Sequence, residues 1–337
     1  MNENEQHLET ESRLVRWWDS GTAGVLLHDK WFRAAFLVLL LLVILAGLLL
    51  PRLWTTTPAG FTPVVRVSGL DRVQARSLRS SAQGHETAGR YKEAVHAWSA
   101  AIANDPGQPD LIRGLVRTVL NEKPLNEENI GPTFGRLVWL LRLTRTNQAD
   151  LELTLEFLDR CRLDDFVVRF GRLRNETLSG EGAARYARAL YQTGDYPGFD
   201  RFWLRHEPEF SMRPEMPVYR HAWLSLHGPE VKLQEGRRQL AEDRRAPATR
   251  LLAARLQLDV SAALLDPQTF EESLRVLEDA HQDRPRDHAL HWRLLRETGR
   301  GVEALARARA YGTAPTTPAE ARDLALAYDR LGLGEMA

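Results

Sequence analysis

The stretch from residue 82 to residue 106, AQGHETAGRYKEAVHAWSAAIANDP, is the feature that most limits how this chain can fold. Small side chains recur in it at helical spacing, which lets two antiparallel helices approach closely. A glycine between them can take the left-handed conformation of a tight turn, and a proline ends the second helix because it cannot continue one. A helical hairpin is therefore expected over residues 75–108. The residues that carry the pattern are Ala82, Gly89, Tyr91, Ala94, Trp98, Ala101 and Pro106.

These seven positions resemble the tetratricopeptide repeat (TPR), a family of stacked helical hairpins. The resemblance implies an all-α fold, an α-α superhelix of TPR-like hairpins, in which the first helix of each hairpin lines a binding surface. It also implies a protein or peptide as the partner. The residues that carry the resemblance pack the hairpins together, so they do not indicate which partner is bound.

The same rhythm continues less faithfully downstream. Helical runs alternate with short breaks, and the pattern predicts seven hairpins plus a final helix over residues 71–337. Asp266 and Pro267 replace the expected glycine turn in one unit. Units without the motif pair residues 109–121 with 131–144, 149–161 with 163–177, and 215–227 with 229–243. Further positions that match the motif are Gly194, Tyr196, Ala280, Pro285, Gly299 and Ala304.

Residues 34–50, AAFLVLLLLVILAGLLL, form an uncharged and almost wholly apolar run. At about 1.5 Å per residue it is roughly 25 Å long, rather short of the ~30 Å hydrocarbon core. Trp31 and Trp54 extend it toward the interfaces, giving limits of about 31–54. The sequence predicts a single transmembrane helix; a cleaved signal peptide is the alternative, disfavoured by the long leader and the lack of an A-x-A site.

The basic residues around this run predict its orientation. Arg13, Arg16, Lys30 and Arg33 precede the run, whereas Arg52 and Arg66 follow it. By the positive-inside rule, residues 1–33 are expected in the cytoplasm and the repeat domain outside it, in the periplasm if the membrane is a bacterial inner membrane. Residues 55–70 are rich in Thr, Pro and Gly and are expected to form an extended spacer. Residues 64–67 could be a short strand, but the sequence offers no partner.

Composition narrows the function classes. Lys+Arg and Asp+Glu balance at 45 each, which argues against nucleic-acid binding. Cys161 is the only cysteine and lies in an apolar helical run, so no disulfide is expected. Catalytic and phosphate-binding motifs are absent. His288 and His291, with His281 before them, are candidate metal ligands, but a structural role is favoured. No enzyme activity, cofactor, metal or small-molecule substrate is expected.

Arginines supply the one candidate binding pattern. The offsets that face the groove in TPR proteins, carried over by the resemblance, select seven of them as a discontinuous basic stripe. Such a stripe could bind carboxylates of an extended peptide or a chain terminus. The alternative is that an arginine-rich protein exposes arginine on every face. The seven are Arg76, Arg79, Arg185, Arg188, Arg255, Arg293 and Arg296.

The sequence thus predicts a membrane-anchored TPR-like scaffold that mediates protein–protein interaction in the cell envelope, as an accessory of assembly, secretion or maturation. A structural subunit of a larger membrane complex, held mainly through its transmembrane helix, is the alternative. A lipid bilayer is expected as the partner of residues 34–50.

Overall fold

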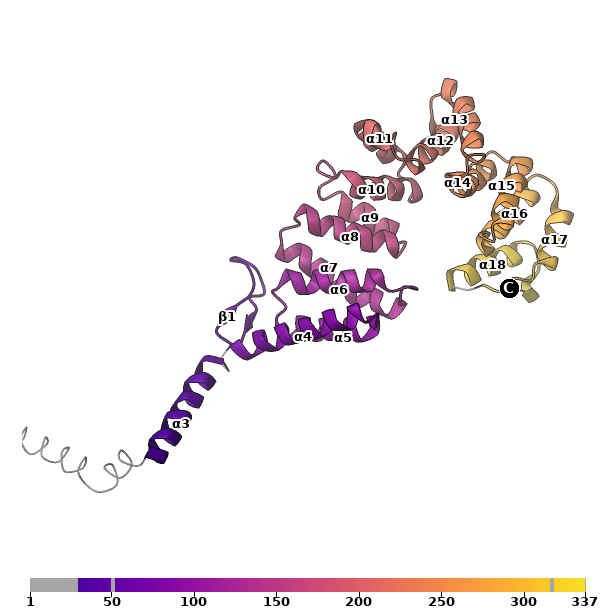
Figure 1. Ribbon diagram of the computed structural model, residues 1–337. Coiled ribbons are helices and arrows are strands. Elements are labelled where there is room, and N and C mark those ends of the chain that lie inside the picture. Colours follow the sequence, from indigo (N-terminus) through magenta and orange to yellow (C-terminus); the bar gives the residue numbers. More distant parts are fainter. Residues whose placement is uncertain (1–29, 50–51, 316–317, 337) are drawn as a thin grey trace, which may run out of the picture. The chain divides into compact units, whose positions relative to one another are not determined.

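The computed structural model describes residues 30–49, 52–315 and 318–336, and these are almost entirely α-helical (Figure 1). The chain divides into two compact units, Met1–Leu153 and Thr154–Ala337, whose boundary falls within one helix. The expectation of an all-α, repeat-like fold is confirmed. Residues 1–29, most of the predicted cytoplasmic segment, lie outside the described residues.

The described part of unit 1 starts with one apolar helix and a small β-ribbon, after which helices pack in pairs. Helices α4 and α5 form the first hairpin, and α6 with α7 the second. The elements are α3 (Lys30–Leu49), β1 (Trp54–Thr55), β2 (Arg66–Val67), α4 (Gly69–Thr87), α5 (Tyr91–Asn104), α6 (Pro109–Asn121), η1 (Glu127–Asn129), α7 (Ile130–Leu143) and α8 (Gln148–Arg160), which crosses into unit 2.

Unit 2 continues the alternation to the last described residue. Four hairpins, α10–α11 to α16–α17, are followed by a single helix, so the helix order agrees with the expected rhythm. The elements are α9 (Asp164–Gly171), α10 (Gly180–Gln192), α11 (Tyr196–Phe210), α12 (Glu215–His227), α13 (Glu230–Asp243), α14 (Arg250–Ala263), α15 (Pro267–Asp279), α16 (Pro285–Glu297), α17 (Gly301–Ala310), α18 (Pro318–Arg330) and η2 (Gly334–Met336).

The first helices of the unit 2 hairpins form a continuous row. Helix α12 packs on α10 and α14, and α16 packs on α14 and α18. Each second helix packs mainly on its own partner and covers one side of the row. Apolar clusters fill the interfaces: Phe270 and Leu294 lie in the cluster between α14, α15 and α16, and Trp292 and Tyr328 in the cluster between α16, α17 and α18.

Most of the motif residues lie where a repeat needs them. Ala82, Ala94, Ala101 and Ala304 have no exposed surface, so the paired helices meet closely at these positions. Ala280 differs from the expectation, because it is exposed at the end of α15 and joins no apolar cluster.

Glycine turns join the helices of three hairpins. Gly89, Gly194 and Gly299 have φ values of 71°, 77° and 82°, a left-handed conformation that glycine adopts without steric cost. In each turn, the residue after the glycine donates its N–H to a carbonyl five residues earlier, at 2.7–2.9 Å. This is the hydrogen bond of a Schellman motif, and it satisfies a carbonyl at the helix end.

The same turn recurs where the sequence has no glycine. Arg162, Leu265 and His281 have φ values of 55°, 55° and 52°, and each is followed by the same five-residue hydrogen bond, at 2.8–2.9 Å. A side chain in this conformation costs roughly 1 kcal/mol or more. The α8–α9 and α14–α15 hairpins and the α15–α16 connection therefore keep the turn at some cost in stability.

Residues 52–68 differ from the extended spacer that the sequence suggested. Trp54 and Thr55 pair antiparallel with Val67 and Arg66, so the strand for which the sequence offered no partner pairs with residues eleven to thirteen positions earlier. The loop between the strands packs on the second hairpin: Phe61 meets Trp139 edge-on, with ring centroids 4.9 Å apart. The sequence indicated a linker because Thr, Pro and Gly are typical of linkers. Composition does not reveal the strand pairing or the contact with Trp139.

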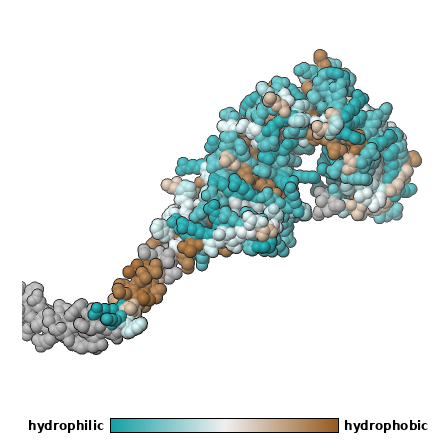
Figure 2. Space-filling model, viewed as in Figure 1, coloured by the Kyte–Doolittle hydropathy of each residue, from teal (hydrophilic) through white to brown (hydrophobic). Residues whose placement is uncertain are grey.

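The apolar helix α3 stands out in Figure 2 as a band of hydrophobic surface. Its described large apolar side chains are exposed, Leu37 by 62% and Leu45 by 41%. Over the part of the chain that the structure describes, no helix combines the length and the apolarity needed to cross a membrane.

The left-handed turns yield a stability prediction. Leu265 is half-exposed, so Leu265→Gly gives up little burial and relieves the left-handed strain. We expect the free energy of unfolding to rise by about 0.5–1 kcal/mol. Gly299→Ala should lower it by a similar amount. Urea unfolding of the full-length chain in detergent, followed by circular dichroism, checks both; a loss of stability with Leu265→Gly contradicts the prediction.

Candidate functional site, a basic groove between three first helices

Helices α14, α16 and α18 surround a hollow of about 420 Å³, here called the C-terminal groove. The exposed side chain of Leu326 contributes apolar surface to it, Trp292 lies buried behind its wall, and small side chains such as Ala262 and Ala289 keep it open. All three helices are first helices of the unit 2 row. The charged residues that line the groove are Asp259, Arg286, Arg293, Arg296, Asp323 and Arg330.

The groove is electropositive, since four arginines face two aspartates. Arg286, Arg293 and Arg296 are all exposed on α16. Arg293 lies 3.7 Å from Glu297, a surface pair that contributes little and can reorient. Arg296 donates a 2.5 Å hydrogen bond to the carbonyl of Arg330 and so links α16 to α18. The guanidinium groups of Arg286 and Arg293 are the ones best placed to meet an anionic ligand.

Asp259 lies on the α14 side of this groove. Its side chain is exposed to water in the hollow, yet helices crowd it, and this burial raises the pKa of the carboxyl. Arg286 opposes the rise, Asp287 adds to it, and Arg255 and Arg293 oppose it. The positive charge of the nearby arginines thus favours the ionised carboxylate, while burial among the helices disfavours it.

The seven arginines predicted as a stripe have different surroundings. Arg185 and Arg188 share the carboxylate of Asp159, at 3.7 and 3.1 Å. Arg255 binds the carboxylate of Asp287 and the carbonyl of Gln282, and is mostly buried.

The remaining four predicted arginines are exposed. Arg76 and Arg79 lie on α4 in unit 1. Only Arg293 and Arg296 of the seven line the C-terminal groove.

Sequence reasoning missed Arg286, Arg330, Asp259 and Asp323. Two signals were available for the arginines. Arg286 lies seven residues before Arg293, which places both on one face of a helix. Arg330 lies 34 residues after Arg296, close to the length of one repeat. The aspartates had no comparable signal, because nothing in the sequence distinguishes them from other surface carboxylates.

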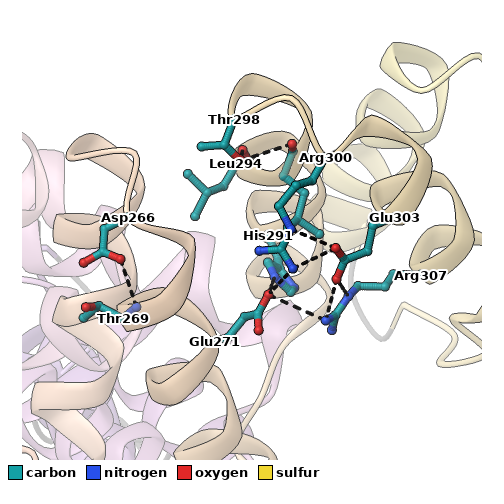
Figure 3. A network of polar contacts seen from close by, with 10 residues as sticks. Asp266, Thr269, Glu271, His291, Leu294, Thr298, Arg300, Glu303 and Arg307 are labelled. Carbon is teal, nitrogen blue, oxygen red and sulfur yellow. Dashed lines mark hydrogen bonds and ion pairs between the residues drawn. The ribbon is translucent and has the colours of Figure 1, made fainter.

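A polar network supports α16 on its other side, toward α15 and α17 (Figure 3). Glu271 on α15 lies 3.2 Å from Arg300 and 3.6 Å from Arg307. Glu303 on α17 binds the same two arginines, at 2.7 and 2.9 Å. The two carboxylates therefore hold the guanidinium groups between α15 and α17.

His291 is the buried member of this network. Its ring is 1% exposed, stacks on Phe270 with centroids 5.2 Å apart, and lies 3.5 Å from Glu271. Burial lowers its pKa to about 4, and Arg307 adds to the effect against the opposing pull of Glu271. The imidazole is therefore neutral near pH 7. Helix α16, which lines the groove, thus packs on α15 through an uncharged side chain.

The other two histidines weighed as ligands lie in separate surroundings. His288 contacts Asp283 at 2.9 Å and packs beside Tyr311, whereas His281 is exposed in a turn. Within residues 30–49, 52–315 and 318–336, no group of three or more His, Cys, Asp or Glu side chains is arranged to hold a metal ion.

No protein-family model matches this chain, and no curated protein matches it in sequence.

The network yields a prediction about acid stability. An unfolded histidine titrates near pH 6.5, so a folded pKa of about 4 leaves stability intact above pH 6.5. Between pH 6.5 and 4 stability should fall by up to about 3 kcal/mol, because the unfolded state binds the proton first. His291→Gln should flatten this fall, whereas His96→Gln, an exposed histidine on α5, should not. Urea midpoints measured from pH 7.5 to 4.5 check it; parallel curves for wild type and His291→Gln contradict it.

Proposed function

We propose that this chain is a membrane-anchored, TPR-like scaffold that binds an acidic segment of a partner protein in the C-terminal groove. The observation that carries the proposal is the lining of that groove, in which four arginines outnumber two aspartates on adjacent first helices. The assignment as a TPR-like scaffold is supported by the motif residues of α4–α5, by the repeated turns, and by the row of first helices.

The chemistry of the groove favours an extended acidic peptide as the ligand. Guanidinium groups bind carboxylates with two parallel hydrogen bonds, and a hollow open along α16 can receive several acidic side chains in succession. Leu326, which is 49% exposed, would contact apolar side chains between the acidic ones. The lining offers no pair of groups with the geometry of a nucleophile and its base, so binding rather than catalysis is the proposed activity.

The membrane anchor is proposed for residues 34–50. The support is their composition and the exposure of the described apolar side chains of α3, since a surface of this kind is costly in water. The run alone is somewhat short for a bilayer, and Trp31 and Trp54 at its ends would complete it in the interfacial layers. The basic residues before the run favour a cytoplasmic N-terminus and a repeat domain on the far side, the periplasm for a bacterial inner membrane.

The groove proposal is tested by reversing charge. We expect Arg286→Glu with Arg293→Glu to weaken binding of a fluorescein-labelled octaglutamate peptide at least tenfold. This follows because each hydrogen bond to a charged group contributes about 1.5–3 kcal/mol. Fluorescence anisotropy with the full-length chain in detergent measures the affinity.

The matched control is Arg275→Glu with Arg309→Glu, which makes the same charge change at exposed positions on α15 and α17. The control pair should retain the wild-type affinity. Equal weakening by both pairs would mean that only net charge matters, and the groove would then not be the binding site. A photo-crosslinker at Leu326, compared with one at Val302 on α17, then identifies the natural partner in native membranes.

The second candidate, a subunit held in a larger complex mainly through α3, is favoured by the exposed apolar surface of that helix, which also fits another membrane helix. Exchanging residues 31–54 for an unrelated single-span anchor separates the two. Under the scaffold proposal, crosslinking from Leu326 persists after the exchange. Loss of the crosslink from correctly inserted protein would favour the subunit instead.

A further inference from the structure

The segment just after α3 exposes an unusual density of apolar side chains. Five large ones lie between residues 53 and 73 with 40–67% of their surface exposed, whereas exposed apolar residues of the hairpins beyond are scattered. Arg52 and Arg66 are exposed among them. We call the five the collar: Leu53, Trp54, Val64, Leu70 and Val73. Tryptophan, arginine and aliphatic residues together are typical of segments at a membrane interface.

The collar is attached firmly to the first hairpin. Strand pairing joins Trp54 to Val67, and the guanidinium of Arg72 on α4 lies 5.0 Å from the ring of Trp54. Ser68 and Asp71 form a capping box at the start of α4, with hydrogen bonds of 3.1 and 2.8 Å. The collar therefore belongs to the same body as α4 and cannot swing away as a linker would.

The attachment extends to the second hairpin. Arg142 on α7 donates a 2.9 Å hydrogen bond to the carbonyl of Thr62 and covers the ring of Phe61 at 5.3 Å. A Cβ added at Gly107, in the α5–α6 turn, would collide with Thr56. The ribbon is thus held between the turn of one hairpin and a helix of the next.

Chain length limits how far the collar can lie from α3. Arg52 follows Leu49, the last residue of α3, by three Cα steps, which reach at most about 11 Å. The headgroup layer on each side of a bilayer is roughly 5–8 Å thick. If α3 ends at the edge of the hydrocarbon core, Arg52 to Trp54 must lie in or beside that layer.

We propose that the collar rests on the bilayer surface, with Arg52 and Arg66 toward anionic lipid headgroups, and so holds the first two hairpins in one orientation on the membrane. This inference rests on the proposed membrane anchor. It adds a lipid-binding surface outside α3 and commits to the bilayer, rather than a protein, as the occupant.

The test uses single-cysteine variants of the full-length chain with Cys161→Ala, each labelled with an environment-sensitive fluorophore. They are reconstituted into vesicles of phosphatidylcholine and phosphatidylglycerol that carry a nitroxide quencher in the upper acyl chain. The labelled positions are Leu53 and Val73 in the collar, Leu41 in α3, and Val302 as a control. Val302 is matched to Val73 as an exposed helical valine.

We expect quenching and a blue shift at Leu53 and Val73, quenching at Leu41, and neither change at Val302. Quenching at Leu41 without quenching at Leu53 and Val73 would overturn the collar and leave the anchor standing. Absence of quenching at Leu41 would overturn the anchor and the collar with it. Equal quenching at Val302 would also overturn the inference, because contact would not be specific to the collar.

Discussion

The left-handed turn at the end of a helix is the constraint on which this architecture depends. It reverses the direction of the chain within two or three residues, so the next helix runs antiparallel to the first. The apolar sides of the two helices are then buried against each other. In unit 2 this turn joins the helices of the α10–α11, α14–α15 and α16–α17 hairpins, and first helices lie beside first helices from α10 to α18. The C-terminal groove is a product of that placement, because its charged side chains come from three helices far apart in sequence.

Sequence predicted the fold better than the site. Glycine and alanine positions in α4–α5 mark the hairpin because backbone geometry there admits few residue types. In the middle of the chain, the alternation of helical runs and breaks was the main signal for hairpins. Arg162 and Leu265 take a left-handed conformation there, which arginine and leucine rarely adopt and which their identity therefore does not predict. The ribbon was missed because Trp54 and Val67 pair through backbone groups, and its packing on α7 depends on Arg142, eighty residues from its partner Thr62.

The arginines illustrate why a charged residue's role is hard to predict. Their shared helical offset was visible, but the carboxylate that each would meet depends on the neighbouring hairpin. Asp159 forms ion pairs with Arg185 and Arg188, and Asp287 forms one with Arg255. These guanidinium groups therefore stabilise contacts between helices. Arg286 and Arg293 line the groove, and the one ion pair of Arg293, with Glu297 at 3.7 Å, is an exposed pair within its own helix. Local pairing thus decides which cations are available for binding.

The ion pairs between first helices have a further consequence. Arg113 on α6 grips Asp150 at the start of α8 with two hydrogen bonds, of 2.7 and 2.9 Å, and Arg255 on α14 meets Asp287 on α16. Each carboxylate is nearly or fully buried, so removing its partner is costly. At these two interfaces, each hairpin thus carries the complement of one specific neighbour. Deleting or exchanging a repeat at either interface would leave a buried carboxylate without its partner, so these neighbours depend on each other for stability.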